Sequence, residues 1–211
     1  MAPKFFLTGT LFCVLVFAVL TLSLGGEPTE SIKQTADKII SIISDPELQI
    51  SGQDAEKKEK LKKRNKLVRD VVDERFDWEE FSRRTLARHW RDRTDEEKKG
   101  FIDLFGTLLE RTYLDQVEGY SGEKVVYLDE KVDGDYAVVD VKIITKKETE
   151  IPVRYRLKKK ENEWFVYDVI VEGVSLVNNY RTQFNSIMIR YKYEGLIKRL
   201  RAKVESQQED L

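Results

Sequence analysis

Apolar residues recur every three or four positions through the first half of the chain, a spacing typical of helices with one buried face. From residue 29 onward this pattern predicts four helices, at residues 29–45, 55–76, 78–90 and 94–119. Asp77 can cap the third helix, and Thr94 with Glu97 forms a capping box that opens the fourth. A polar linker at residues 46–54 separates the first two helices. We therefore expect a helical N-terminal half.

The pattern changes to alternation after residue 123, which predicts strands. The four candidate strands are residues 124–130, 136–145, 150–159 and 163–172. Because the turns between them are short, the strands should form antiparallel hairpins. The second and third strands carry apolar side chains on one face and charged side chains on the other. The fourth is apolar on both faces, so it should be central or covered on both sides.

Helices are expected again at the C-terminal end, one entered at residues 178–181 and a basic amphipathic one at residues 191–204. Four antiparallel strands behind a helical half predict an α+β domain, in which a curved sheet cups the helices. The inner face of the sheet should turn toward the apolar stripe of residues 101–117. Such a cup is either filled by side chains or holds an apolar ligand in a pocket between the sheet and the helices.

The first 25 residues have the pattern of a signal peptide. Lys4 precedes an apolar run at residues 5–24, and small residues lead to Gly25, where a signal peptidase could cut. The polar residues that follow favour cleavage, although a run of this length leaves an uncleaved membrane anchor as the alternative. Residues 26–211 would then be a single exported domain.

Composition narrows the classes of function. Charged residues make up 36% of the chain, but the formal net charge is -1, which argues against the one-sided basic surface of a nucleic-acid-binding protein. Cys13 is the only cysteine and would leave with the signal peptide. The mature domain would therefore contain no disulfide, thiolate nucleophile or cysteine metal site. Its stability must come from its core, for which a hydrophobic content of 41% is sufficient.

The sequence nominates no catalytic or metal-binding set. His89 is the only histidine and has no candidate nucleophile or orienting partner, so we interpret it as structural. Ser175 follows Gly173 as in a nucleophile elbow, but Val177 stands where the second glycine should be. The acidic residues within 129–135 flank hairpin turns and lack the spacing of a calcium loop. We therefore expect no enzyme, no metal and no cofactor.

The junction at residues 169–184, VIVEGVSLVNNYRTQF, is rich in apolar residues for a strand-to-helix connection. With positions elsewhere it resembles the MlaC or toluene-tolerance family over about residues 32–204. The residues that carry the resemblance are Phe76-Asp77-Trp78, Trp90-Arg91, Phe101, Phe105, Leu108-Leu109, Tyr113, Trp164, Tyr167-Asp168-Val169, Glu172-Gly173-Val174-Ser175-Leu176-Val177, Asn179-Tyr180-Arg181 and Phe184. One departure is His89, which replaces a glycine common in the family before the Trp-Arg pair.

Proteins of that family are periplasmic phospholipid carriers that serve an ABC transport system of Gram-negative envelopes. The resemblance implies a pocket that takes phospholipid acyl chains while the headgroup stays near solvent. It also implies two partners, an outer-membrane lipoprotein complex and an inner-membrane complex of an MCE-domain protein with an ABC transporter. No catalysis and no metal are implied, and we expect a monomer.

On this basis the lipid-binding pocket should be lined from the long helix, the sheet and the junction by Phe101, Phe105, Leu108, Val139, Val141, Val153, Tyr155, Val169, Val171, Val174, Leu176, Tyr180 and Phe184. For any single aromatic among them, ordinary core packing is the better interpretation. Arg181 has two interpretations. It could hold a lipid phosphate at the mouth of the pocket or pair with Glu172, and we favour the pair.

Two other functions compete with the carrier. The first is an envelope adaptor that has a filled core and carries no lipid. The second is a receptor that delivers a small solute to a transporter, which is disfavoured because such receptors usually have two α/β lobes and a longer chain.

Overall fold

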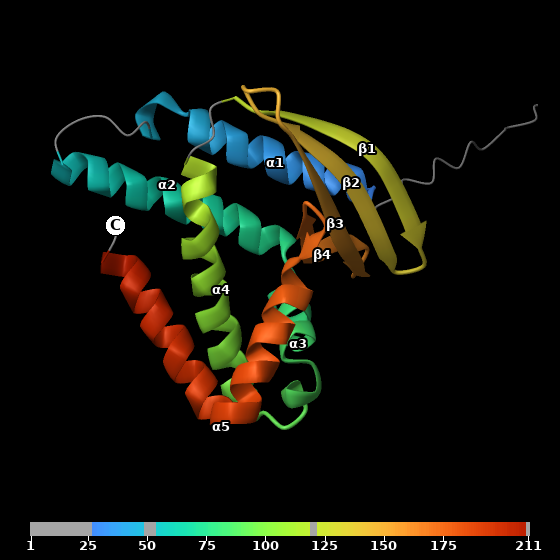
Figure 1. Ribbon diagram of the computed structural model, residues 1–211. Helices are drawn as coiled ribbons and strands as arrows, with labels where there is room; N and C mark the ends of the chain where they lie inside the picture. The colour runs from blue at the N-terminus through green and yellow to red at the C-terminus, as the bar shows by residue number, and fades with distance from the viewer. Residues whose placement is uncertain (1–26, 49–53, 119–121, 210–211) are drawn as a thin grey trace, which may run out of the picture.

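The computed structural model describes residues 27–48, 54–118 and 122–209, and these form an α+β arrangement (Figure 1). The signal peptide predicted for residues 1–25 lies outside the described residues. In chain order the elements are α1 (Pro28–Ser44), η1 (Pro46–Leu48), α2 (Asp54–Arg75), α3 (Trp78–Leu86), η2 (Ala87–Trp90), α4 (Asp95–Glu118), β1 (Lys124–Asp133), β2 (Tyr136–Ile144), β3 (Glu150–Lys160), β4 (Glu163–Val171), β5 (Val174–Ser175) and α5 (Leu176–Glu209).

The helix starts follow the local chemistry that the sequence predicts. Asp77 caps α3 by accepting a hydrogen bond from the Glu80 backbone N–H at 3.0 Å. The capping box before α4 is confirmed, because Thr94 Oγ1 accepts from the Glu97 N–H at 3.2 Å and Glu97 Oε2 accepts from the Thr94 N–H at 2.9 Å. These side chains satisfy backbone donors that a helix start leaves unpaired.

Two predicted boundaries in the helical half are wrong. The single helix expected at residues 78–90 is instead α3 followed by the 3₁₀ helix η2, since Ala87 adopts a left-handed φ of 49° that ends α3. The linker expected at residues 46–54 contains the 3₁₀ turn η1.

The sheet is antiparallel throughout, and its strand order is the chain order β1-β2-β3-β4-β5. The prediction of four strands is therefore wrong by one. Glu172 and Gly173 both have positive φ angles, 50° and 83°, and turn the chain back so that Val174 and Ser175 pair with the end of β4. A two-residue hairpin turn with two positive φ angles matches the natural twist of the strands.

The last helix also starts earlier than predicted, because α5 begins at Leu176 rather than at residue 178. Lys192 interrupts α5 with a left-handed φ of 59° and a ψ of -170°, so the chain doubles back toward α4 (Figure 1). None of the helices in the described ranges is long and apolar enough to cross a membrane.

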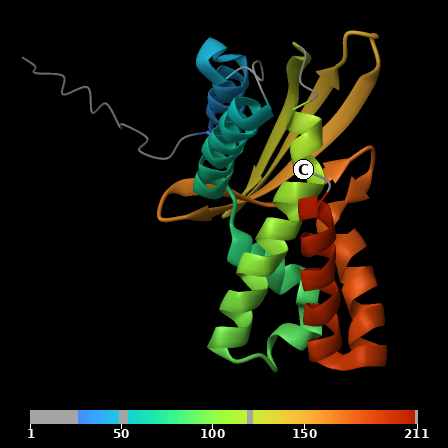
Figure 2. The same cartoon turned by 90° about the vertical axis from the view of Figure 1, so that its left-hand side faces the viewer.

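The apolar residues form two separate clusters. The sheet cluster joins the inner face of β2, β3 and β4 to Ile32 of α1 and to Phe76, while the helical cluster joins α3, α4, α5 and Trp90 of η2. Figure 2 shows the same division: α1 and α2 lie beside the sheet, and α3, α4 and α5 form a bundle below it. The expectation that the inner face turns toward the stripe of residues 101–117 is therefore wrong for its described part, since Phe101, Phe105, Leu108 and Leu109 pack within the helical cluster.

Candidate functional site

The inner face of the sheet is a continuous apolar surface that spans four strands. Cross-strand partners share a face, so the register of the ladders builds this surface row by row. One row runs through Val125, Ile143 and Ile151, the next through Tyr127, Val141, Val153 and Val171, a third through Val139, Tyr155 and Val169, and a fourth through Ala137, Leu157 and Val166.

This surface is closed at one end and half-covered at the other. At the closed end, Val139, Leu157 and Val166 are completely buried, in the cluster that also contains Ile32 and Trp164. The first three rows also contain residues that are only partly buried, and we call these residues the half-covered end: Val125, Tyr127, Ile143, Ile151, Tyr155, Val169 and Val171. A partly buried apolar face of this size is the part of the sheet that can accept an apolar ligand without unfolding the core.

Six of the thirteen predicted lining residues lie together on this inner face. Val139, Val141 and Val153 are buried, while Tyr155, Val169 and Val171 belong to the half-covered end. The alternation of apolar and charged residues in the strands was the signal that located them.

Six other predicted lining residues lie in the helical cluster: Phe101, Phe105, Leu108, Leu176, Tyr180 and Phe184. Their rings pack on one another, with centroids 4.9 Å apart for Phe105–Tyr180, 5.1 Å for Phe105–Phe184 and 5.8 Å for Phe101–Phe184. Distances of this kind mark contact between aromatic rings, so side chains fill the space among these three aromatic positions.

Val174, the thirteenth residue, belongs to neither cluster. It lies on β5 at the edge of the sheet and its side chain is 56% exposed. The predicted ion pair of Arg181 with Glu172 is also absent from the described contacts. Arg181 instead donates its Nε to the backbone carbonyl of Arg84 at 2.8 Å, which ties α5 to α3.

Asp168, to which the sequence analysis assigned no role of its own, holds the junction together through its buried carboxylate. Asp168 is 1% exposed, and it accepts hydrogen bonds from Ser175 Oγ at 2.7 Å and from the Val177 N–H at 3.1 Å. Arg156 lies 3.2 Å from the same carboxylate on β3. Ser175 Oγ in turn accepts from the Asn178 N–H at 3.1 Å. The serine therefore caps the start of α5, which is a structural role.

Two tyrosines interrupt the apolar surface of the half-covered end. Burial raises the pKa of Tyr155, and it raises the pKa of Tyr127 to about 12, with a further contribution from the negative charge of Asp37. Both phenols are therefore protonated at neutral pH and are hydrogen-bond donors on this face of the sheet.

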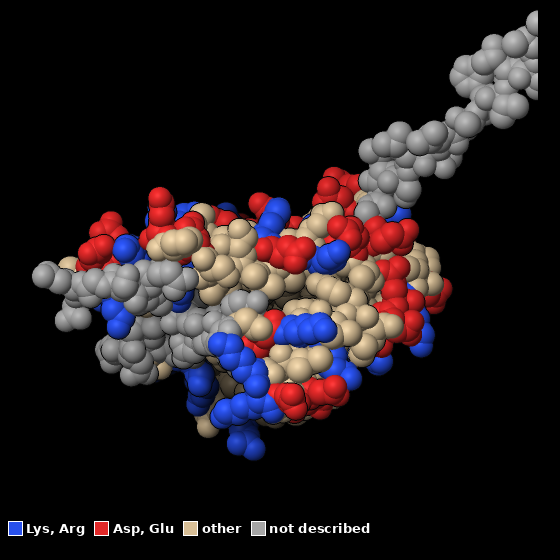
Figure 3. Space-filling view, turned by 90° about the horizontal axis from the view of Figure 1, so that it is seen from above, with Lys and Arg blue, Asp and Glu red and all other residues tan. Residues whose placement is uncertain are grey.

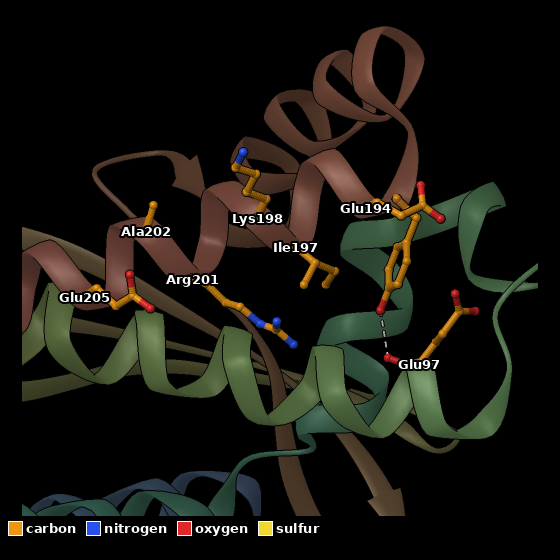
Figure 4. Close-up of a pocket in the computed structure, with 8 residues that line it drawn as sticks. Glu97, Glu194, Ile197, Lys198, Arg201, Ala202 and Glu205 are labelled. Carbon is orange, nitrogen blue, oxygen red and sulfur yellow. Dashed lines mark hydrogen bonds between the residues drawn. The ribbon is translucent and has the colours of Figure 1, made fainter.

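A separate cavity of about 590 Å³ lies between the start of α4 and the second part of α5 (Figure 4). Most of the residues that line it are charged, and Tyr193 donates its hydroxyl to the backbone carbonyl of Glu97 at 2.8 Å on one side. Charged residues of both signs, including Lys198, Arg201 and Glu205, lie around it. Its chemistry does not match the apolar pocket that the sequence predicts.

The outer surface carries charges of both signs. Figure 3 shows acidic and basic side chains interspersed over the face seen from above. His89 lies 3.1 Å from Asn185 Oδ1 through its Nε2, a contact between η2 and α5. Within the described ranges, no group of three or more histidine, cysteine, aspartate or glutamate side chains is arranged to hold a metal ion.

Comparisons with known proteins agree on one family and one fold. A family model described as MlaC protein matches residues 33–202. The intermembrane phospholipid transport system binding protein MlaC of Haemophilus influenzae is 25% identical over 122 residues, which span 56% of this chain and 57% of that protein. A solved structure of a phospholipid-binding protein from Ralstonia solanacearum, in complex with a phospholipid, matches with a TM-score of 0.75 and 24% identity. That match covers 87% of this chain and 99% of the other, so the fold is shared over almost its whole extent.

Proposed function

Because the chain belongs to the MlaC protein family, we propose that it is a periplasmic carrier that binds phospholipid and moves it between the inner and outer membranes. The observation that carries the proposal is the half-covered end of the inner sheet face, whose apolar side chains have no complete cover in the described structure. Relatives named for phospholipid transport and binding support the same ligand.

Acyl chains fit this surface because burial of apolar groups alone can bind them. Each methylene transferred from water contributes on the order of 0.8 kcal/mol, so two chains can be held without a charged anchor. Val141 and Val153 would form the floor of the site, and Ile143, Ile151 and Val171 its outer part. The packed aromatic residues of the helical cluster would support the site rather than line it.

Export and partners belong to the same proposal. The apolar run at residues 5–24 would direct the chain to the periplasm and be removed after Gly25. The carrier would then deliver lipid, as a monomer, to an inner-membrane complex of an MCE-domain protein with an ABC transporter and exchange it with an outer-membrane lipoprotein complex.

Transport of this kind needs no chemical step. Ser175 and His89 are the side chains that a catalytic mechanism could use. Both make structural contacts, Ser175 with Asp168 and His89 with Asn185. Desolvation of the acyl chains supplies the binding free energy, so we expect the protein to act without catalysis.

The alternative, an adaptor with a filled core, draws on the helical cluster, where Phe101, Phe105 and Leu196 are completely buried. It differs from the carrier in one measurable property, the presence of bound lipid. We therefore propose native mass spectrometry of the protein purified from the periplasm, together with organic extraction and lipid analysis.

If the protein is a carrier, we expect a complex that is heavier than the apoprotein by the mass of a phospholipid, and the same lipid in the organic extract. A bare mass that persists after incubation with phospholipid vesicles would contradict it and favour the adaptor.

A further inference from the structure

Tyr127 and Tyr155 occupy adjacent rows of the inner sheet face. Tyr127 pairs with Val141 on β2, and Tyr155 pairs with Val139 on the same strand, two residues away. The two tyrosines are thus on strands two positions apart, about 10 Å across the sheet, and on the same face.

Neither hydroxyl is used by the fold. Among the described residues no hydrogen-bond partner exists for either phenol, and neither belongs to the buried polar atoms that lack a partner. Both tyrosines are partly buried among apolar residues, and burial raises the pKa of both phenols. A donor without a partner within a partly buried apolar cluster is available to a ligand that brings an acceptor.

The charges nearby decide which acceptor such donors suit. Burial is the main cause of the raised pKa of Tyr127, and the negative charges of Asp37 and Glu30 on α1 contribute to it. A phosphate or a fatty-acid carboxylate at this point would be repelled by the two negative charges. A neutral acceptor is not repelled, and the ester carbonyls of a diacyl lipid are neutral acceptors flanked by apolar chains.

We propose that Tyr127 and Tyr155 donate hydrogen bonds to the two acyl-ester carbonyls of a bound lipid and so make the protein selective for ester-linked, diacyl lipids. This inference rests on the proposed carrier function and adds the class of lipid. The valines around the phenols bind the chains, and the phenols fix how deeply the glycerol end enters.

The test compares two lipids that differ only in the ester carbonyls. The protein is incubated with vesicles that contain equal amounts of a diacyl phosphatidylethanolamine and of its dialkyl ether analogue with the same chain length. Native mass spectrometry then gives the ratio of the two complexes. Because one hydrogen bond to a neutral acceptor changes affinity about fivefold, the wild-type ratio should favour the diester by at least about fivefold.

Variants locate the selectivity. Tyr127→Phe and Tyr155→Phe should each lower the ratio, and the double variant should bring it close to one while the ether lipid still loads. Tyr136→Phe is the matched control, because Tyr136 lies on the opposite face of β2 and is 41% exposed, and it should keep the wild-type ratio.

Three results overturn the proposal. A wild-type ratio near one, or a preference that survives in the double variant, would show that the phenols do not select the ester while leaving the carrier function intact. Failure of both lipids to load would remove the carrier function itself, and the proposal with it.

Discussion

At the scale of single residues, the molecule separates side chains that hold the fold from side chains left free for a ligand. Asp168 receives donors from two neighbouring elements and a cation from a third, so its hydrogen-bonding capacity is used. Tyr127 and Tyr155 have no such partners among the described residues. We interpret this contrast as the residue-level sign of a binding face.

Removal of the Asp168 carboxylate should damage the junction between β4 and α5. Asp168→Ala leaves the Ser175 hydroxyl, the Val177 N–H and the charge of Arg156 without their acceptor, and breaking a buried pair typically costs about 3 kcal/mol or more. We predict a loss of this size in the free energy of unfolding, measured by urea denaturation.

Asp140→Ala is the control for that prediction. Asp140 pairs with Arg154 at 2.6 Å on the outer face of the sheet, where Arg154 is 50% exposed, so its loss should cost about 1 kcal/mol or less. Equal losses for the two variants would contradict the anchoring role of Asp168.

Glu80 gives the fold a defined response to acid. Burial by itself would raise the pKa of this carboxyl, but its hydrogen bonds to Arg83 and Arg84 and their charges outweigh that effect and hold the pKa below the usual 4.5. Because the folded pKa is depressed, the pairs stabilise the fold above pH 4.5, and this contribution is lost as the pH falls through the folded pKa.

Glu80→Gln should therefore be less stable than the wild type at neutral pH. The difference in the free energy of unfolding should disappear in acid, well below the ordinary glutamate pKa, in urea denaturation repeated across pH. A difference that stays constant with pH would show that the charge of Glu80 does not contribute.

At the scale of elements, α5 depends on a sharp kink. Lys192 has a left-handed φ of 59°, and Gly195 follows where a Cβ would lie 2.3 Å from the Cβ of Tyr191. That contact cannot be relieved by rotating a flexible side chain. The kink places Tyr193 and Leu196 in the helical cluster, so it is part of the core.

Substitution of two helical glycines by alanine should act in opposite directions. Gly195→Ala should lower the free energy of unfolding by about 1–3 kcal/mol, because the added methyl overlaps Tyr191. Gly100→Ala, in α4 with nothing within 4 Å of its Cβ position, should raise it by up to about 1 kcal/mol. Thermal or urea unfolding measures both, and a stable Gly195→Ala variant would contradict the close approach.

The helices and strands could be predicted from the sequence where a local pattern, such as a capping box or an alternation, marks their bounds. The capping box of Thr94 and Glu97 and the alternation in β2 and β3 predicted their elements almost to the residue. The turn at Glu172-Gly173 was expected from the sequence, but the left-handed φ angles of Ala87 and Lys192 were not, because residues other than glycine seldom adopt this conformation. The division into two clusters was missed for a similar reason, since an apolar stripe does not specify its partner.

At the scale of the whole molecule, the protein combines a filled helical cluster with an incompletely covered sheet. The helical cluster supplies rigidity, and the half-covered end leaves apolar surface available to a ligand. Six of the predicted lining residues pack within the filled helical cluster, and their partners there could not be identified from the sequence pattern.

A charge at the closed end should behave differently from a charge at the half-covered end. Val139 is completely buried, so Val139→Asp should unfold the domain and reveal nothing about the ligand. Ile151 lies in the half-covered end, so the carboxylate of Ile151→Glu can stay near solvent. It would nevertheless place a charge on the apolar surface. Circular dichroism should therefore show a folded Ile151→Glu protein and an unfolded Val139→Asp protein.

The most direct test of the central claim is the lipid-bound fraction of Ile151→Glu, measured by native mass spectrometry of protein from the periplasm. Its control is Val138→Glu, which places the same charge on the opposite face of the sheet, where Val138 pairs with Arg156. We predict that Ile151→Glu is folded and loses its bound phospholipid, while Val138→Glu stays loaded like the wild type. Equal loading of the two folded variants would contradict the assignment of the half-covered end as the lipid site.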